Sequence, residues 1–149
     1  MLVRTDDYEL DDSLDRIDFE RVHNWLSESY WSPGVAREKV EQAARNSALV
    51  VGAYAREGQV GFLRVVSDKT TFAWICDVIV DEAYRGRGVG RAMVRFAQEH
   101  PDLQGLRRWI LATRDAHGVY AGCGFEPINN PERWMIYIPN PVPGVDDCR

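Results

Sequence analysis

The stretch "VDEAYRGRGVGRAMV" (residues 80–94) sets three arginines among three glycines, between one apolar run and the next. Glycine permits tight backbone turns, and arginine is the side chain best suited to bind anions. From Gly88 to His100, apolar side chains recur at i, i+3, i+4, i+7 and i+8, which predicts an amphipathic helix that ends at Pro101. The stretch therefore predicts a turn from a buried strand into a helix, with an anion at the turn.

Backbone amides at this turn are the expected anion ligands. The first N–H groups of a helix have no partner inside the helix and carry the positive end of its dipole. Glycines leave those amides accessible, and the arginines add charge around them, so a pyrophosphate group suits the site. The residues expected to surround it are Arg85, Gly86, Arg87, Gly88, Val89, Gly90 and Arg91.

Two nucleotide-binding motifs do not fit this turn. The dinucleotide fingerprint G-x-G-x-x-G needs a third glycine at position 91, where Arg91 stands, and no acidic ribose partner follows at the expected distance. The P-loop is excluded because the chain has no G-K-[ST] sequence. A glycine-rich turn with solvated arginines stays open as the alternative.

Periodicity along the chain predicts an α/β (α+β) fold with a mixed, mostly antiparallel sheet. Helices are expected over 18–29, 35–46, 88–100 and 115–123. Strands are expected over 2–10, 48–55, 59–67, 70–80, 107–113 and 133–138. The 149 residues fit a single domain, and three prolines predict an extended tail over 139–149.

Composition narrows the class of protein. A net charge of -5 and only two lysines argue against a nucleic-acid partner, although residues 81–115 hold seven arginines against five acids. Three scattered cysteines, Cys76, Cys123 and Cys148, favour reduced thiols in the cytoplasm over disulfides or a metal site. No signal peptide and no membrane-spanning run is visible, so no membrane partner is expected.

The R-x-x-G-x-G pattern from Arg85 to Gly90 resembles the acyl-coenzyme A loop of the GNAT N-acetyltransferases. The segment "DAHGVYAGCGFEP" (115–127) is similar to a second segment of that family, a short helix that carries a tyrosine and ends at Gly-Phe. The resemblance implies a central sheet of six to seven strands flanked by about four helices, and acetyl-CoA as co-substrate. The chain departs from the family at Asp115, where Asn often contacts the coenzyme.

The same resemblance implies roles for individual residues. Ile79 and Val80 would pair their main chain with the pantetheine arm, and His117 would line the coenzyme channel. Tyr120 would contact the coenzyme and act as general acid toward the departing thiolate, as a phenol can. Asp77 interrupts an apolar strand and needs a partner there, so it is expected either to bind or deprotonate the acceptor amine or to be a structural carboxylate.

The resemblance also implies an acceptor site built by the first two helices and the loop between them. Tyr30 and Trp31 form an aromatic pair which, with Glu28 and Asp77, suits a small cationic amine through cation–π and ionic contacts. Covering the core is an equally open role for the two aromatic residues.

The resemblance therefore implies an N-acetyltransferase in which a primary amine of a small molecule attacks the thioester directly in a ternary complex. A non-catalytic acyl-CoA-binding or regulatory domain, and acetylation of a protein or peptide amine, are the alternatives. The general base, the acyl length and the acceptor stay open. A homodimer also stays open, because dimers are common in such folds.

Overall fold

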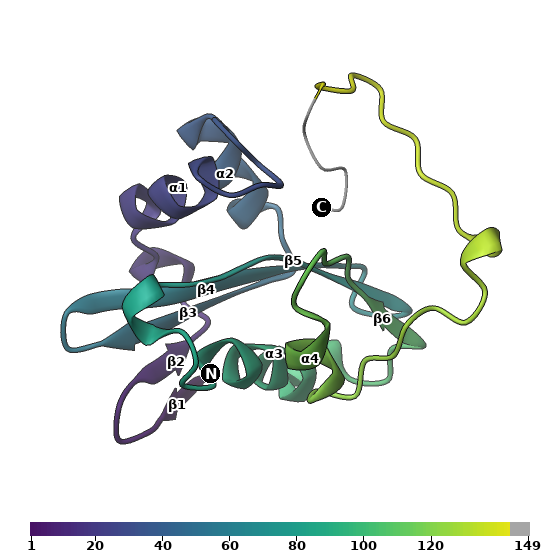
Figure 1. Cartoon of the computed structure of the whole chain (residues 1–149). Coiled ribbons are helices and arrows are strands. Elements are labelled where there is room, and N and C mark those ends of the chain that lie inside the picture. The colour runs from purple at the N-terminus through teal and green to yellow at the C-terminus, as the bar shows by residue number, and fades with distance from the viewer. Residues whose placement is uncertain (144–149) are drawn as a thin grey trace.

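The computed structural model describes residues 1–143 and contains one six-stranded sheet with helices on both faces (Figure 1). The strands are β1 (Leu2–Arg4), β2 (Glu9–Asp11), β3 (Leu49–Ala55), β4 (Gly58–Ser67), β5 (Phe72–Val80) and β6 (Arg108–Ile110). The helices are α1 (Phe19–Ser27), α2 (Arg37–Arg45), α3 (Val89–Glu99) and α4 (His117–Ala121). Short 3-10 turns lie at Leu14–Arg16, Glu82–Tyr84, Pro101–Leu103 and Pro131–Arg133.

Strand order in the sheet follows chain order. Strands β1 to β5 are antiparallel neighbours, and β6 pairs parallel with β5 after the crossover through α3. Helices α1 and α2 cover one face, and α3 and α4 lie against the other (Figure 1). The arrangement confirms the predicted α+β fold with a mostly antiparallel sheet. No helix within residues 1–143 is long and apolar enough to cross a membrane.

Two apolar clusters hold these layers together. The larger one packs α3 against the sheet through the stripe that the sequence predicts, with Met93 and Phe96 buried among strand residues such as Leu63. The smaller one packs α1 and α2 on the opposite face, around Val22 and Phe62. Burial of these apolar faces, rather than helix propensity, keeps the two short helices α1 and α2 in place.

A β-bulge at Asp77 bends β5 in the middle of the sheet. Phe62 lies opposite Ile79 and Arg64 lies opposite Cys76, so β5 has one residue more than β4 over this interval. Asp77 takes the extra position with a φ of 55°, a left-handed conformation that Asp adopts more readily than most residues. Strand β6 pairs with β5 only over Phe72–Trp74, so beyond the bulge that edge of β5 is open.

The predicted strand at 2–10 is divided into two. Thr5 makes a tight turn, in which its Oγ1 accepts the backbone N–H of Tyr8 at 3.0 Å and its own N–H donates to the Tyr8 carbonyl at 2.9 Å. Such side-chain turns compete with a continuous strand, so β1 and β2 form a hairpin. The predicted strand at 107–113 is likewise shorter, because only Arg108–Ile110 pairs with β5.

The strand predicted over 133–138 is wrong for the single chain. This segment has no regular structure after the turn at Pro131–Arg133, and Met135 is 98% exposed. It runs away from the sheet as the long yellow arc of Figure 1. An apolar pattern forms a strand only when it pairs with a neighbouring strand, and within residues 1–143 this segment pairs with none. The extended tail is described as far as residue 143; residues 144–149, and with them Cys148, lie outside the described residues.

Candidate active site

The glycine turn leads into α3 with its amides uncovered. Gly86 and Gly88 have φ values of 77° and 80°, and Gly88 is the N-cap of α3. The first bond of the helix joins the Ala92 N–H to the Gly88 carbonyl at 2.9 Å, so the preceding helical amides have no partner inside α3. No side chain caps this end. A Cβ added at Gly86 or Gly88 would meet no atom within 4 Å, so open space lies beside the turn.

A pocket of about 490 Å³ lies over these amides. Its lining includes Arg85 and Arg91 from the turn, Val80 from β5 and Val119 from α4. Arg85 donates from Nε to the Val80 carbonyl at 3.1 Å. The third arginine, Arg87, stacks over the Tyr84 ring at 4.9 Å from the ring centroid. Exposed amides beside two lining guanidinium groups fit the phosphates expected from the sequence.

The open edge of β5 continues from this pocket. Asp81 donates its N–H to the Val60 carbonyl of β4 at 2.8 Å. Because backbone groups alternate between the two edges of a strand, those of Ile79 face β4 and those of Val80 face the open edge. The main chain of Val80 therefore fits the expected pairing with a ligand, whereas that of Ile79 does not.

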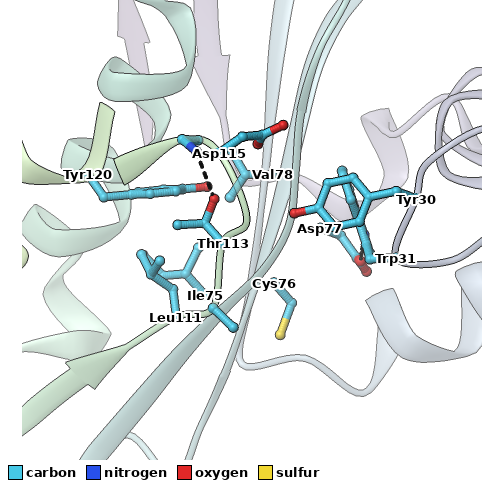
Figure 2. Close-up of a pocket in the computed structure, with 12 residues that line it drawn as sticks. Tyr30, Trp31, Ile75, Cys76, Asp77, Val78, Leu111, Thr113, Asp115 and Tyr120 are labelled. Atoms are coloured by element: carbon cyan, nitrogen blue, oxygen red, sulfur yellow. Dashed lines mark hydrogen bonds between the residues drawn. The ribbon is translucent and has the colours of Figure 1, made fainter. Parts of the chain in front are cut away.

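A second, smaller pocket of about 110 Å³ lies where β5 and β6 separate (Figure 2). Three segments contribute to it: the loop between α1 and α2, the middle of β5, and the chain from β6 into α4. Its polar lining residues are Tyr30, Trp31, Asp77, Thr113, Asp115 and Tyr120. The structure thus brings together four residues that the sequence predicts as catalytic or substrate-binding.

Tyr120 is the protonated phenol of this pocket. Burial, with a smaller contribution from Tyr30, raises the pKa of Tyr120 to about 12. Its ring packs edge-on against Phe125 at 6.1 Å and points toward Thr113 in Figure 2. The phenol therefore carries a proton at neutral pH, and its raised pKa makes it a weaker acid than an exposed tyrosine.

Asp77 is paired on both carboxylate oxygens. Arg64 Nε lies 2.6 Å from Asp77 Oδ2, and the Trp31 indole donates to Asp77 Oδ1 at 3.0 Å. The two charged side chains are only 14% and 20% exposed, for Asp77 and Arg64 respectively. Sequence reasoning missed Arg64. The signal was available, because Arg64 interrupts the apolar run of β4 as Asp77 interrupts that of β5, and antiparallel neighbours pair such charges.

Tyr30 connects the two sides of the pocket. Its hydroxyl accepts the backbone N–H of Arg114 at 3.2 Å, and the Arg114 guanidinium lies 3.7 Å from its ring centroid. The Tyr30 and Trp31 rings meet edge-on at 4.9 Å. Both rings line the pocket, and Trp31 also packs against the smaller apolar cluster. Glu28, also expected here, is exposed and lines neither pocket.

Two further residues considered from the sequence, His117 and Cys76, have no clear part in either pocket's chemistry. His117 begins α4 as an exposed side chain and lines a separate hollow beside β6 instead of the pocket over the glycine turn. Burial raises the pKa of Cys76 to about 11, so this thiol stays protonated and is a poor nucleophile. Within residues 1–143, no three His, Cys, Asp or Glu side chains lie close enough together to hold a metal ion.

Comparison with known proteins agrees with this geometry. The family model of the acetyltransferase (GNAT) domain matches residues 45–127, more than half of the chain. The crystal structure of a GNAT-family protein from Xanthomonas campestris pv. campestris is 39% identical, covers 93% of this chain and 95% of its own, and superposes with a TM-score of 0.84.

Two curated relatives match over shorter lengths. Glucosamine 6-phosphate N-acetyltransferase 1 of Oryza sativa subsp. japonica is 46% identical over 50 residues, 33% of this chain and 30% of its own length. An uncharacterized ycf52-like N-acetyltransferase of Prochlorococcus marinus is 29% identical over 103 residues, 66% of this chain and 55% of its own. The chain thus spans about a third to a half of these curated relatives. The family model and the full-length structural match together show that the chain belongs to the GNAT family of acetyltransferases.

Proposed function

We propose that the protein is an acetyl-CoA-dependent N-acetyltransferase that acts on a primary amine of a small molecule. The observation that carries this proposal is the continuity of three features: the uncovered amides at the start of α3, the open edge of β5, and the pocket that holds Tyr120. A ligand with a polyphosphate at one end and a reactive thioester at the other matches that path.

The chain's own groups would hold the coenzyme along this path. The amides from Val89 to Arg91 and the Arg85 and Arg91 guanidinium groups would bind the pyrophosphate. The Val80 main chain would pair with the extended arm at the open edge of β5. When bound, the coenzyme supplies an acetyl group activated as a thioester.

Proton transfer would rest on Tyr120. From the pocket wall, Oη would donate its proton to the sulfur as the thioester C–S bond breaks and the new amide C–N bond forms. The proton lost by the attacking amine would pass to solvent, which would return a proton to Oη. We assign Asp77 a positioning role rather than that of a base, because Arg64 and Trp31 occupy its two oxygens. Asp77 then fixes the Trp31 ring that forms one wall of the pocket.

The acceptor would be a small amine. The pocket of about 110 Å³ is the smaller of the two described above, which favours a small acceptor. The Trp31 ring and the Asp115 carboxylate line the pocket and would suit a basic amine. The Arg114 guanidinium lies over the Tyr30 ring and 3.6 Å from Asp115, so the amine would compete with it for these groups. The free thiols of Cys76 and Cys123 support a cytoplasmic location.

Substitution of Gly88 tests the proposal. An aspartate there would place a negative carboxylate at the helix N-cap, where it competes with phosphate for the amides. In Gly88→Asp, calorimetry should show loss of acetyl-CoA binding. Gly105→Asp is the matched control, because Gly105 also has a positive φ of 75° and open space around it but lies outside the pocket.

A screen for thiol release with acetyl-CoA and a panel of small amines, amino acids and peptides identifies the acceptor. Release with a small amine supports the proposal, and release only with peptides moves the acceptor to a protein amine. Tight coenzyme binding with no release across the panel would instead indicate a non-catalytic domain. Unchanged acetyl-CoA affinity in Gly88→Asp would show that the coenzyme does not bind at the start of α3.

A further inference from the structure

Gly122 ends α4 in direct contact with the side chain of Arg91. The glycine is the C-cap of the helix, with a φ of -65° and a ψ of -13°, a helical conformation that other residues adopt freely. A Cβ added there would lie 2.8 Å from Arg91 Cζ and Nε and 2.9 Å from Nη2. The close approach of the guanidinium group, and not the backbone conformation, therefore requires glycine at this position.

Arg91 keeps its side-chain donors free in this contact. Among residues 1–143, its only hydrogen bond outside α3 is made by its main-chain carbonyl, which lies 3.7 Å from the Cys123 thiol that donates to it. The guanidinium group thus rests on the main chain of Gly122 without a protein acceptor. Arg91 also lines the pocket of about 490 Å³ over the start of α3, so its unused N–H groups are available to a phosphate there.

The end of α4 is held against α3 beside this contact. Arg95 Nη2 donates to the Gly122 carbonyl at 3.1 Å, and Gln98 Nε2 donates to the Cys123 carbonyl at 3.0 Å. Both donors belong to α3, which packs on the sheet through its buried stripe. Because Arg91 has a long side chain with several rotatable bonds, its guanidinium group is the part that would move if position 122 carried a side chain.

A displaced Arg91 has room away from the phosphate pocket. A hollow of about 280 Å³ lies between α3 and the β1–β2 hairpin, and Arg91 is part of its lining too. Glu99 lines the same hollow and would attract a cation. The contact with Gly122 therefore favours the one of two available positions in which Arg91 serves the pocket over the start of α3.

We propose that Gly122 is a positioning residue for coenzyme binding, because its bare main chain holds the Arg91 guanidinium group where the pyrophosphate of acetyl-CoA would bind. The inference rests on the proposed function, which takes the coenzyme to bind at the start of α3. Gly122 lines neither pocket of the candidate active site, so it acts through Arg91 alone. The contact also joins the phosphate site to α4, the helix that carries Tyr120.

Calorimetry of acetyl-CoA binding to Gly122→Ala tests the proposal. The added methyl group displaces Arg91, so Kd should rise about tenfold, as for loss of one charge-assisted hydrogen bond. Gly118→Ala is the matched control, since Gly118 lies in the same helix but has nothing within 4 Å of an added Cβ, and Kd should not change. Thermal unfolding should show both variants at least as stable as the wild type, because alanine favours a helix more than glycine does.

A double-variant cycle separates positioning of Arg91 from a general effect on α4. Arg91→Ala should itself raise Kd about tenfold, and Gly122→Ala should add nothing in that background. Additive effects, an unchanged Kd in Arg91→Ala, or acetyl-CoA binding by Gly122→Ala as tight as that of the wild type would each overturn the inference and leave the coenzyme site standing. A wild-type protein that does not bind acetyl-CoA would overturn the proposed function, and this inference with it.

Discussion

Arg64 Nε lies 2.6 Å from the Asp77 carboxylate, and this ion pair stands at the bulge where the central sheet opens. Arg64 comes from β4 and Asp77 from the extra residue of β5, so the pair ties the two strands together where their register shifts. The Trp31 indole completes the cluster by donating to the same carboxylate. The ion pair thereby positions an aromatic wall of the pocket.

Loss of Arg64 should destabilise the fold. In Arg64→Met the mostly buried Asp77 carboxylate loses its cation, and removal of one partner from such a pair lowers the free energy of unfolding by about 3 kcal/mol. Chemical denaturation measures the change. Arg37→Met, which removes the exposed Arg37–Glu41 pair, should stay within about 0.5 kcal/mol of the wild type.

The double variant Arg64→Met/Asp77→Asn separates charge from packing. Asparagine tolerates the left-handed backbone of position 77 and still accepts the Trp31 N–H, so most of the lost stability should return. If Arg64→Met alone were as stable as the wild type, the pair would have no structural role and Asp77 would again be a candidate base.

Replacement of Tyr120 should affect turnover more than binding. Tyr120→Phe removes the hydroxyl that we propose as proton donor, while the ring keeps its edge-on contact with Phe125. We expect kcat to fall about tenfold or more, with the affinity for acetyl-CoA nearly unchanged. Steady-state kinetics and calorimetry give the two quantities. Tyr8→Phe, a partly buried tyrosine in the β1–β2 turn, is the control, and an unaltered kcat in Tyr120→Phe would exclude Tyr120 from catalysis.

Local periodicity was sufficient to predict α3 and the central strands. The α3 stripe is readable because burial against one sheet face imposes helical spacing on the sequence itself. The prediction of a strand over 133–138 was wrong because a strand also needs a neighbouring strand to pair with, and the sequence does not show where such a strand lies. The same apolar residues have strand character in either case, so only the arrangement of the chain in space decides their state.

Some features of the candidate site could likewise be predicted from the sequence, and others could not. Tyr120, Asp77, Tyr30 and Trp31 could be assigned to one site only through the resemblance to the GNAT family, because no pattern within their separate segments shows that they meet. The sequence could not predict that the main chain of Val80, and not that of Ile79, faces the open edge of β5. That outcome depends on the register between β5 and β4. The contact between Tyr30 and Arg114 spans 84 positions of sequence and left no local signal.

The pH dependence of the free energy of unfolding should show the raised pKa of Tyr120. Its pKa is about 12 in the folded protein and near 10 in the unfolded chain, so the unfolded state loses the proton first as the pH rises. Stability contributed by the neutral phenol is therefore complete below pH 10 and lost as the pH approaches 12. Denaturation measured across this range should show a steeper decline for the wild type than for Tyr120→Phe. Equal slopes would mean that Tyr120 titrates as an exposed tyrosine.

The Tyr30 hydroxyl should hold the loop after β6 over the active-site pocket. It is the acceptor for the Arg114 N–H, so Tyr30→Phe leaves that amide to water. Loss of about 1 kcal/mol of local stability should speed hydrogen exchange at Arg114 about fivefold. Exchange at the Arg107 amide, which donates to the Thr71 carbonyl at 3.0 Å, should not change. Because the aromatic pair lines the pocket that we propose for the acceptor, KM for the amine should also rise while acetyl-CoA affinity stays constant. Faster exchange at Arg114 with an unchanged KM would show that the contact stabilises the loop without shaping the acceptor site.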